Sequence, residues 1–313
     1  MSDTARISVL IPCYNEEAAI AKVVDDFHAA LPTARIYVYD NNSNDETAER
    51  ARQAGAIVRQ ETHQGKGSVV RRMFADIEAD VYVLVDGDDT YDASAAPLLV
   101  RTLVDEGMDL VSGRRIAVAQ AAYRAGHVLG NRMLTGLTAA MFRVKLGDLL
   151  TGYRVLSRRF VKSFPFTAEG FGIETELTVH AVRLLMPMVE VDTRYKERPE
   201  GSVSKLNTWR DGFRILLTIM ALVREERPLV FFSSLFALLA VLSLLIGTPV
   251  VLEFFRTGYV PRLPTAVLAM GLMVLAFLSM ASGLVLDTVT RGRWEIKRVA
   301  YLAIPGPHDL KLP

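Results

Sequence analysis

The sequence contains very little cysteine and almost no net charge. Its 313 residues include a single cysteine, Cys13, which excludes an intrachain disulfide and is compatible with a reducing compartment. Lys and Arg together number 36 against 35 Asp and Glu, so the formal net charge is +1. A general nucleic-acid-binding protein is normally strongly basic, and this balance argues against that class. Cys13 lies beside a predicted strand end, where we expect a packed thiol rather than a nucleophile.

The first residues also lack the pattern of a signal peptide. The opening stretch MSDTARISVLIPCYNEE contains no cationic region followed by a long apolar region. We therefore expect the N-terminal part of the chain to stay in the cytosol. The composition then changes abruptly near Pro228, where long apolar runs begin.

Up to about residue 200, short β-rich runs alternate with amphipathic helical runs. We expect strands at 6–12, 34–40, 56–60, 81–86 and 109–113, and helices at 16–31, 45–54, 67–78 and 93–106. This alternation predicts an α/β fold with right-handed crossovers and a mostly parallel sheet covered by helices on both faces. Ligands of such sheets bind beyond the carboxyl ends of the strands, where the polar clusters PCYNEE, DNNSND, DGDD and SGRR lie.

A dense group of acids follows the fourth predicted strand. Asp86, Asp88, Asp89 and Asp92 fall within seven residues. Left alone, these carboxylates would repel one another and raise their own pKa values, so a hard divalent cation is the strongest candidate for a partner. Asp86 and Asp88 form a D-x-D pair in which Gly87 leaves room for a ligand to approach the backbone. The alternative interpretation is a solvated acidic turn that caps the next helix.

The D-x-D pair also implies an anionic ligand. A hydrated Mg²⁺ or Mn²⁺ takes one or two carboxylates together with phosphate oxygens, which points to a diphosphate. Lys66 belongs to a Gly-Lys-Gly that opens a predicted helix, and backbone N–H groups at a helix start attract anions. The run ERPEGSVSK adds a second flexible cationic turn with Arg198 and Lys205.

Two uncharged runs follow in the C-terminal third, one between Pro228 and Glu253 and one from Leu263 to Leu286. At about 1.5 Å per residue, each is long enough to cross a hydrocarbon core of about 30 Å. The short loop between them predicts a two-helix transmembrane hairpin. Basic residues flank both ends of the hairpin, whereas the loop carries only Arg256 and Arg262, so the positive-inside rule puts both ends in the cytoplasm.

These observations predict four parts of the chain: a cytosolic domain at 1–205, a juxtamembrane amphipathic helix at 206–227, the hairpin at 228–290 and a cytoplasmic tail at 291–313. Apolar residues recur at helical spacing in the second part. Either a core-facing helix or a helix lying on the membrane surface would show this pattern.

Eight motifs occur in the order seen in family 2 glycosyltransferases: VLIPCYNEE, VYDNNSND, HQGKG, LVDGDD, SGRR, DLLTGYRVLSRR, GFGIETEL and ERPEGSVSK. The resemblance covers about the first 210 residues. With the hairpin added, the chain is most similar to the polyprenyl-phosphate glycosyltransferases, relatives of dolichyl-phosphate mannose synthase. The resemblance implies a nucleotide-diphospho-sugar transferase (GT-A) fold, inversion at the anomeric carbon, a nucleotide-diphospho-sugar donor, a polyprenyl phosphate acceptor, and Mg²⁺ or Mn²⁺ as cofactor.

The resemblance also implies roles for individual residues. Nucleotide-sugar binding is implied for Pro12, Tyr14, Glu16, Asp40, Lys66, Asp86, Gly87, Arg198 and Lys205. Metal binding is implied for Asp86 and Asp88. Binding of the acceptor phosphate is implied for Arg114, Arg115 and Arg124, which with Asp86 and Asp88 make up the expected catalytic residues.

The sequence departs from the family pattern at two places. Asp89 and Thr90 stand where dolichyl-phosphate mannose synthases usually have Leu-Gln, and Asp89 either replaces a metal ligand or caps the next helix. Asn41 takes the place of the second acid in the usual Asp-Asp-Gly-Ser form of the second motif.

The implied reaction is attack of a polyprenyl-phosphate oxygen on C1 of the activated sugar, at the inner face of the cytoplasmic membrane. A phosphate monoester is largely ionised near neutral pH, so no strong general base is needed. One alternative is a transferase with a hydroxyl acceptor, for which Glu174 or Glu176 would supply a base. Another is a membrane-bound scaffold that binds a nucleotide sugar without turnover. UDP- and GDP-sugars both fit, and both a monomer and a homo-oligomer are compatible with the sequence.

Overall fold

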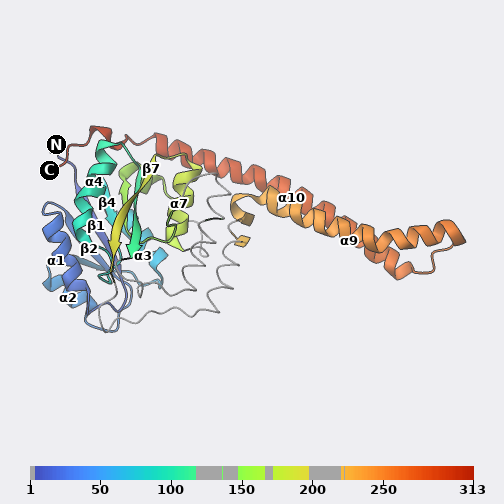
Figure 1. Ribbon diagram of the computed structural model, residues 1–313, viewed down its shortest axis with the longest axis horizontal. Helices are drawn as coiled ribbons and strands as arrows, with labels where there is room; N and C mark the ends of the chain where they lie inside the picture. Colours follow the sequence, from blue (N-terminus) through green and yellow to red (C-terminus); the bar gives the residue numbers. More distant parts are fainter. Residues whose placement is uncertain (1–3, 118–135, 137–146, 166–171, 197–219, 222) are drawn as a thin grey trace. The chain divides into compact units, whose positions relative to one another are not determined.

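The computed structural model describes residues 4–117, 136, 147–165, 172–196, 220–221 and 223–313 (Figure 1). The chain divides into two compact units. The first comprises Met1–Ile215 with Lys297–Pro313, and the second comprises Leu216–Ile296.

The first unit is built on a seven-stranded sheet of order β3-β2-β1-β4-β6-β5-β7. Its strands are β1 (Ile7–Cys13), β2 (Arg35–Asp40), β3 (Ile57–Gln60), β4 (Val81–Leu84), β5 (Leu110–Ala117), β6 (Arg154–Ser157) and β7 (Met188–Tyr195). Four neighbouring pairs are parallel, whereas β6 runs antiparallel to both β4 and β5. The predicted mostly parallel sheet is therefore confirmed, with β6 as an antiparallel insertion.

Helices cover both faces of this sheet (Figure 1). One face is covered by α1 (Ile20–Ala30), α2 (Thr47–Gln53) and α4 (Ala96–Asp105), and the other by α3 (Lys66–Asp76), α6 (Arg158–Ser163) and α7 (Ile173–Arg183). Successive residues of β1 show why both faces need cover, because Val9 and Ile11 pack into one core while Leu10 packs into the other. Nearly all of β1 is apolar and buried, as expected for a strand in the middle of a doubly covered sheet.

The last residues of the chain also belong to the first unit. Tyr301 lies near the end of α10 (Leu263–Leu302), and its hydroxyl donates a hydrogen bond of 2.8 Å to Oδ2 of Asp109. Arg159 donates two further bonds to the same carboxylate, at 2.5 and 2.8 Å. Asp109 is fully buried, so these donors compensate a charge that has no access to water. Residues 297–313, which fall in the predicted cytoplasmic tail, therefore form part of the α/β unit.

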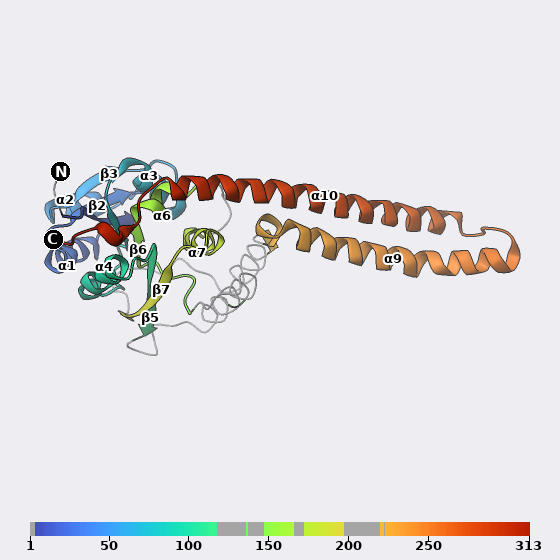
Figure 2. The same cartoon turned by 90° about the horizontal axis from the view of Figure 1, so that it is seen from above.

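The second unit contains α9 (Pro228–Thr257) and the first part of α10. Both helices are long and apolar enough to cross a membrane, with mean hydropathies of 2.7 and 2.2. Hydrogen bonds link them, among them one from Ser243 Oγ to the Ala269 carbonyl at 2.7 Å and one from Ser279 Oγ to the Phe232 carbonyl at 3.0 Å. The two helices lie side by side in Figure 2. The predicted helix at 206–227 lies largely outside the described residues, and its character stays a prediction.

His180 on α7 is a buried histidine that packs against two phenylalanine rings. Its side chain is 3% exposed, and its ring meets those of Phe160 and Phe164 edge-on at centroid distances of 5.2 and 5.1 Å. Nε2 lies 3.1 Å from Oγ of Ser163. Burial, assisted by the positive charge of Lys297, lowers the pKa of His180 to about 3.

This shift predicts a pH dependence of folding. A histidine in an unfolded chain has a pKa of about 6.5, whereas the pKa of His180 in the fold is about 3. Between these two pH values the unfolded chain therefore binds more protons than the folded chain. The contribution of neutral His180 to stability is complete above about pH 6.5 and is lost progressively as the pH falls toward 3. We expect the urea midpoint of the detergent-solubilised chain, followed by far-UV circular dichroism, to fall between pH 7 and pH 5.

The variant His180→Gln keeps a hydrogen-bonding side chain but cannot titrate, so its midpoint should change less over the same interval. His28 on α1, which is only partly buried, provides the control His28→Gln, which should retain the wild-type pH dependence. Equal pH dependence in the wild type and in His180→Gln would contradict the assignment.

Candidate active site

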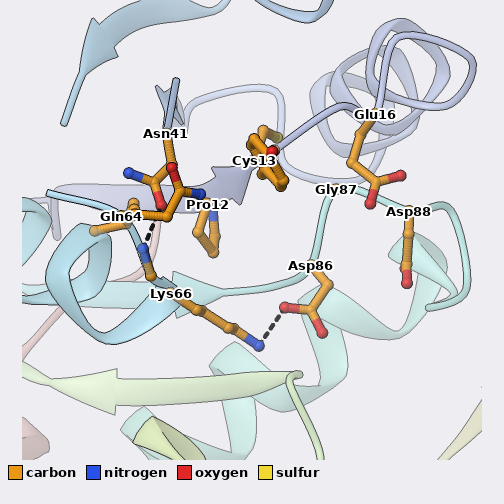
Figure 3. A pocket seen from close by; sticks show the side chains of 12 residues that line it. Pro12, Cys13, Glu16, Asn41, Gln64, Lys66, Asp86, Gly87 and Asp88 are labelled. Atoms are coloured by element: carbon orange, nitrogen blue, oxygen red, sulfur yellow. Dashed lines mark hydrogen bonds and ion pairs between the residues drawn. The ribbon is translucent and has the colours of Figure 1, made fainter. Parts of the chain in front are cut away.

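A pocket lies at the carboxyl ends of the adjacent strands β1 and β4 (Figure 3). Its volume is about 330 Å³, within the range of roughly 300–1,000 Å³ typical of small-ligand sites. It is lined by Pro12, Cys13, Tyr14, Glu16, Asn41, Gln64, Gly65, Lys66, Val69, Asp86, Gly87 and Asp88. Parallel strands end at the same edge of a sheet, so the loops after β1 and β4 meet here. The fold thus brings together most of the residues that the sequence predicted for nucleotide-sugar binding.

Two glycines shape the loop that carries the D-x-D pair. A Cβ on Gly87 would lie 2.6 Å from Sγ of Cys13, so only glycine lets the loop pass over the end of β1. A Cβ on Gly152 would collide with Oδ2 of Asp86. Cys13 itself is buried, and burial raises its pKa, so it is a packed neutral thiol as expected.

Lys66 is the cation at the centre of the site. Its Nζ lies 2.5 Å from Oδ1 of Asp86 and 2.6 Å from Oε1 of Glu174. Lys66 is the first residue of α3, Asp86 follows β4, and Glu174 lies in the first turn of α7. One ammonium thus connects three elements that are far apart in the sequence, and Figure 3 shows its contact with Asp86.

The ionisation of this group follows from burial and pairing. Burial by itself would lower the pKa of Lys66, but the charges of Asp86 and Glu174 outweigh it and raise that pKa above its ordinary value. Burial raises the pKa of Asp86, and the nearby Lys66 charge only partly opposes this. For Glu174 the opposite balance holds, because the Lys66 charge outweighs burial and the pKa of Glu174 is lowered.

The remaining acids of the loop have different surroundings. Asp88 is 4% exposed and accepts a hydrogen bond of 2.6 Å from the Thr90 hydroxyl. Asp89 has a positive φ of 55°, and its carboxylate lies 3.1 Å from Nζ of Lys22 on α1. Asp89 was predicted either to replace a metal ligand or to cap the next helix. It is not among the described residues that line the pocket, so the structure gives no support to the role as a metal ligand. Asp92 accepts the backbone N–H of Ser94 and caps the short 3₁₀ turn Ala93–Ala95.

The donor set fits a partly hydrated divalent cation rather than a site made of protein alone. Within the described residues, no group of three or more His, Cys, Asp or Glu is arranged to hold a metal ion. Asp86 and Asp88 supply hard oxygen ligands at the pocket, and Asp86 already forms an ion pair with the ammonium of Lys66. Mg²⁺ and Mn²⁺ need only one or two carboxylates when water and phosphate oxygens complete the shell. The pocket therefore suits such an ion together with a diphosphate.

Asn41 explains one departure from the family pattern. Its amide Nδ2 donates to the carbonyls of Glu61 and His63 at 2.8 and 2.9 Å, and its Oδ1 accepts the Gly65 N–H at 2.7 Å. A carboxylate could not donate the first two bonds. Asn41 thereby fixes the loop before α3, in which Gly65 adopts a φ of 124°. The sequence motif showed the substitution but not this structural role.

Asp40, at the end of β2, is one of the residues predicted to bind the nucleotide sugar. It is 6% exposed, and its Oδ2 accepts the Ser43 N–H at 3.2 Å. Its Oδ1 is buried without a hydrogen-bond partner among the described residues. An unsatisfied buried oxygen is costly and calls for an explanation, and a donor group from a ligand would supply one.

The predicted phosphate-binding arginines are already paired where the structure describes them. Nε of Arg114 lies 2.5 Å from Oδ1 of Asp192. Arg115 donates two bonds to Asp148, at 2.7 and 2.8 Å, and its guanidinium lies 5.4 Å from the centre of the Tyr195 ring. An acceptor phosphate would have to compete with these carboxylates. Arg124, Arg198 and Lys205 lie outside the described residues, and their roles stay predictions.

Comparison with known proteins identifies the family. The model of glycosyl transferase family 2 matches residues 8–164. The glycosyltransferase AglJ of Haloferax volcanii is 35% identical over 230 residues, which cover 73% of this chain and 75% of that protein. A dolichyl-phosphate hexose transferase of the same organism is 29% identical over 221 residues, covering 71% of this chain and 95% of that protein.

Solved structures agree with this result. The crystal structure of glucosyl-3-phosphoglycerate synthase from Mycobacterium tuberculosis in complex with Mn²⁺, UDP and glucosyl-3-phosphoglycerate matches with a TM-score of 0.57 and 26% identity. The match covers 70% of this chain and 79% of that one. The chain therefore belongs to glycosyl transferase family 2 and has the GT-A fold that its motifs imply.

The two acids of the D-x-D pair should be far more important for glycosyl transfer than their neighbour. We expect Asp88→Ala to lower turnover at least a thousandfold, about 4 kcal/mol of barrier, because it removes a carboxylate that is predicted to bind the divalent cation. Asp89→Ala, which removes a carboxylate directed at Lys22, is the matched control and should keep turnover within about threefold. Near-normal turnover by Asp88→Ala, with unchanged circular dichroism, would contradict the metal assignment.

Proposed function

We propose that this family 2 glycosyltransferase transfers a sugar, with inversion, from a nucleotide-diphospho-sugar to a polyprenyl phosphate at the cytoplasmic face of a membrane. The observation that carries the proposal is the presence, in one chain, of a pocket that holds Lys66 beside the acids of the D-x-D pair and of two helices apolar enough to cross a bilayer. A long prenyl chain stays in the bilayer while its phosphate lies at the interface, so an enzyme that uses it benefits from a membrane anchor.

The pocket residues have distinct proposed roles toward the donor. Lys66 and the N-terminus of α3 attract the diphosphate, because a helix start presents unpaired N–H groups and positive charge. Pro12, Tyr14, Glu16, Asp40, Asp86, Gly87, Arg198 and Lys205 complete the proposed nucleotide-sugar site. Asp86 and Asp88 would hold Mg²⁺ or Mn²⁺, which supplies a Lewis acid to neutralise the leaving diphosphate. In support of a divalent cation, the matched synthase structure contains Mn²⁺.

The state of Glu174 favours a phosphate acceptor over a hydroxyl acceptor. A hydroxyl needs a base, and either Glu174 or Glu176 was suggested for that role; the structure describes the pairing of Glu174. In the structure its carboxylate is paired with Lys66 at 2.6 Å, which lowers its pKa and makes it a weak base. A phosphate monoester arrives already ionised and needs positioning rather than deprotonation.

A soluble phosphate acceptor is the second candidate. It is favoured by the structural match to glucosyl-3-phosphoglycerate synthase, whereas the similarity to a dolichyl-phosphate hexose transferase favours a lipid phosphate. We favour the lipid phosphate because of the two apolar helices, since an enzyme that acts on a soluble acceptor would not need a membrane anchor. Arg114, Arg115 and Arg124 are the proposed contacts to the acceptor phosphate.

The proposed acceptor can be tested directly with the purified chain in detergent. UDP-glucose, UDP-galactose and GDP-mannose would each be offered with undecaprenyl phosphate, undecaprenol or 3-phosphoglycerate. We expect one donor to give product with undecaprenyl phosphate, with activity lost in EDTA and restored by excess Mn²⁺. Faster transfer to undecaprenol or to 3-phosphoglycerate, or full activity in EDTA, would contradict the proposal.

We further propose that α9 and α10 span the cytoplasmic membrane, with both ends of the hairpin in the cytoplasm and the turn around Gly258 outside. Tyr259 in this turn is 77% exposed. In intact cells, a membrane-impermeant maleimide should label a Cys13→Ala/Tyr259→Cys variant. A Cys13→Ala/Arg101→Cys variant, altered on the exposed side of α4, should be labelled only after lysis. The reverse result would overturn the topology.

A further inference from the structure

Lys66 contacts two groups with conflicting requirements. Asp86 is proposed to bind a divalent cation, and Lys66 is proposed to bind a diphosphate. In the structure these two side chains bind each other instead, at 2.5 Å. If the Lys66 ammonium stays on Asp86, its positive charge repels a divalent cation at that carboxylate and is partly neutralised before a diphosphate arrives. Binding of the cation and the donor therefore favours opening of this contact.

Glu174 gives Lys66 a second attachment that does not depend on Asp86. Its Oε1 lies 2.6 Å from Nζ of Lys66. The side chain of Glu174 is 18% exposed, less than that of Lys66 at 31%, so the carboxylate is the more enclosed partner. When Lys66 leaves Asp86, the bond to Glu174 keeps its ammonium at the pocket.

The turn that carries Glu174 is itself firmly supported. The Thr178 hydroxyl donates to the Glu174 carbonyl at 3.0 Å and accepts a bond of 2.9 Å from Arg154. Arg154 is 1% exposed and also donates to the carbonyls of Leu149 and Thr151, at 2.8 and 3.1 Å. A buried arginine with all of these bonds fixes the start of α7, so Glu174 is a stationary anchor for a lysine on a flexible stem.

We propose that Glu174 is a positioning residue, and that Lys66 exchanges Asp86 for the donor diphosphate while it remains bound to Glu174. This inference rests on the proposed function, since it takes Asp86 and Lys66 as donor-binding groups. Asp86 gives up the ammonium and becomes available to the divalent cation. Lys66 then contacts Glu174 and the diphosphate, and each of the three side chains has an oppositely charged partner both before and after the exchange.

The exchange has a thermodynamic consequence. A divalent cation that binds without the donor must displace the ammonium from Asp86, and this competition weakens its binding. A diphosphate that draws Lys66 away removes the competition. Metal and donor therefore bind with positive coupling, and that coupling runs through Lys66.

The test measures binding of Mn²⁺ alone, from the electron paramagnetic resonance signal of the free ion, to the full chain in detergent. Lys66→Met removes the competing ammonium and should tighten Mn²⁺ binding by about fivefold or more. Lys66→Arg keeps a cation and should stay within about twofold of the wild type. Lys22→Met is the matched control, because Lys22 pairs with Asp89 in the same loop but not with Asp86.

The control separates exchange from general electrostatics. If Lys22→Met tightens Mn²⁺ binding as much as Lys66→Met does, long-range charge accounts for the effect and the exchange is wrong. Equal or weaker Mn²⁺ binding by Lys66→Met than by the wild type would also overturn it. Circular dichroism of each variant checks that the fold is retained.

A double-mutant cycle tests the role of Glu174. In the wild-type background, Glu174→Gln leaves Lys66 with Asp86 alone, so Mn²⁺ binding should weaken by about threefold or more. In the Lys66→Met background the same change should have almost no effect, because Glu174 acts through Lys66. Equal effects in both backgrounds would show that Glu174 acts on the metal independently and would overturn the positioning role. None of these measurements uses an acceptor, so failure of the acceptor assay alone would reject the proposed function and leave the exchange standing.

Discussion

The ion pairs of Lys66 are the interaction on which the rest of the site depends. Asp86, Asp88 and Glu174 bring three carboxylates toward one end of the sheet, and such a group is unfavourable without a cation. Lys66 supplies that charge and at the same time connects the start of α3 to the end of β4 and the start of α7. Gly152 limits the space around Asp86, because any side chain there would collide with the carboxylate. Asp86 is thus held both by the charge of Lys66 and by close packing against the backbone.

The sequence was sufficient to predict the elements with continuous apolar runs. The five strands expected up to residue 113 all occur, because runs such as VYVL are buried on both faces and leave little choice of structure. Neither β6 nor β7 was predicted. RVLS is only four residues long, and MVEVDTRY alternates apolar and polar residues at an edge of the sheet, where burial is incomplete. Their place in the sheet is decided by pairing with distant strands, which local patterns do not contain.

The same limit applies to the site. Asp86, Asp88 and Lys66 were predicted because each lies in a short motif with its own chemistry. The partner of Lys66 was not predicted, since Glu174 is 108 residues away and was considered only as a base. Asn41 was noticed as a departure from the family, but its function as a double donor to the Glu61 and His63 carbonyls needs the folded loop. Motifs therefore indicated the groups that are proposed to bind ligands, and the fold was needed to find the residues that contact those groups.

The electrostatics of the pocket also constrain what it can accept. Glu174 is kept ionised by its contact with Lys66, and a carboxylate whose pKa is lowered cannot readily take a proton from an alcohol. The pocket therefore suits an acceptor that brings its own negative charge. That condition is met by a lipid phosphate and by a soluble phosphate ester alike, so the pocket alone does not separate them. The two kinds of acceptor are distinguished by α9 and α10 instead. These helices expose apolar side chains along most of their length, and such a surface favours contact with lipid over contact with water. In the proposed function, the ionised Glu174 favours a phosphate acceptor, and the apolar helices favour a lipid that carries this phosphate.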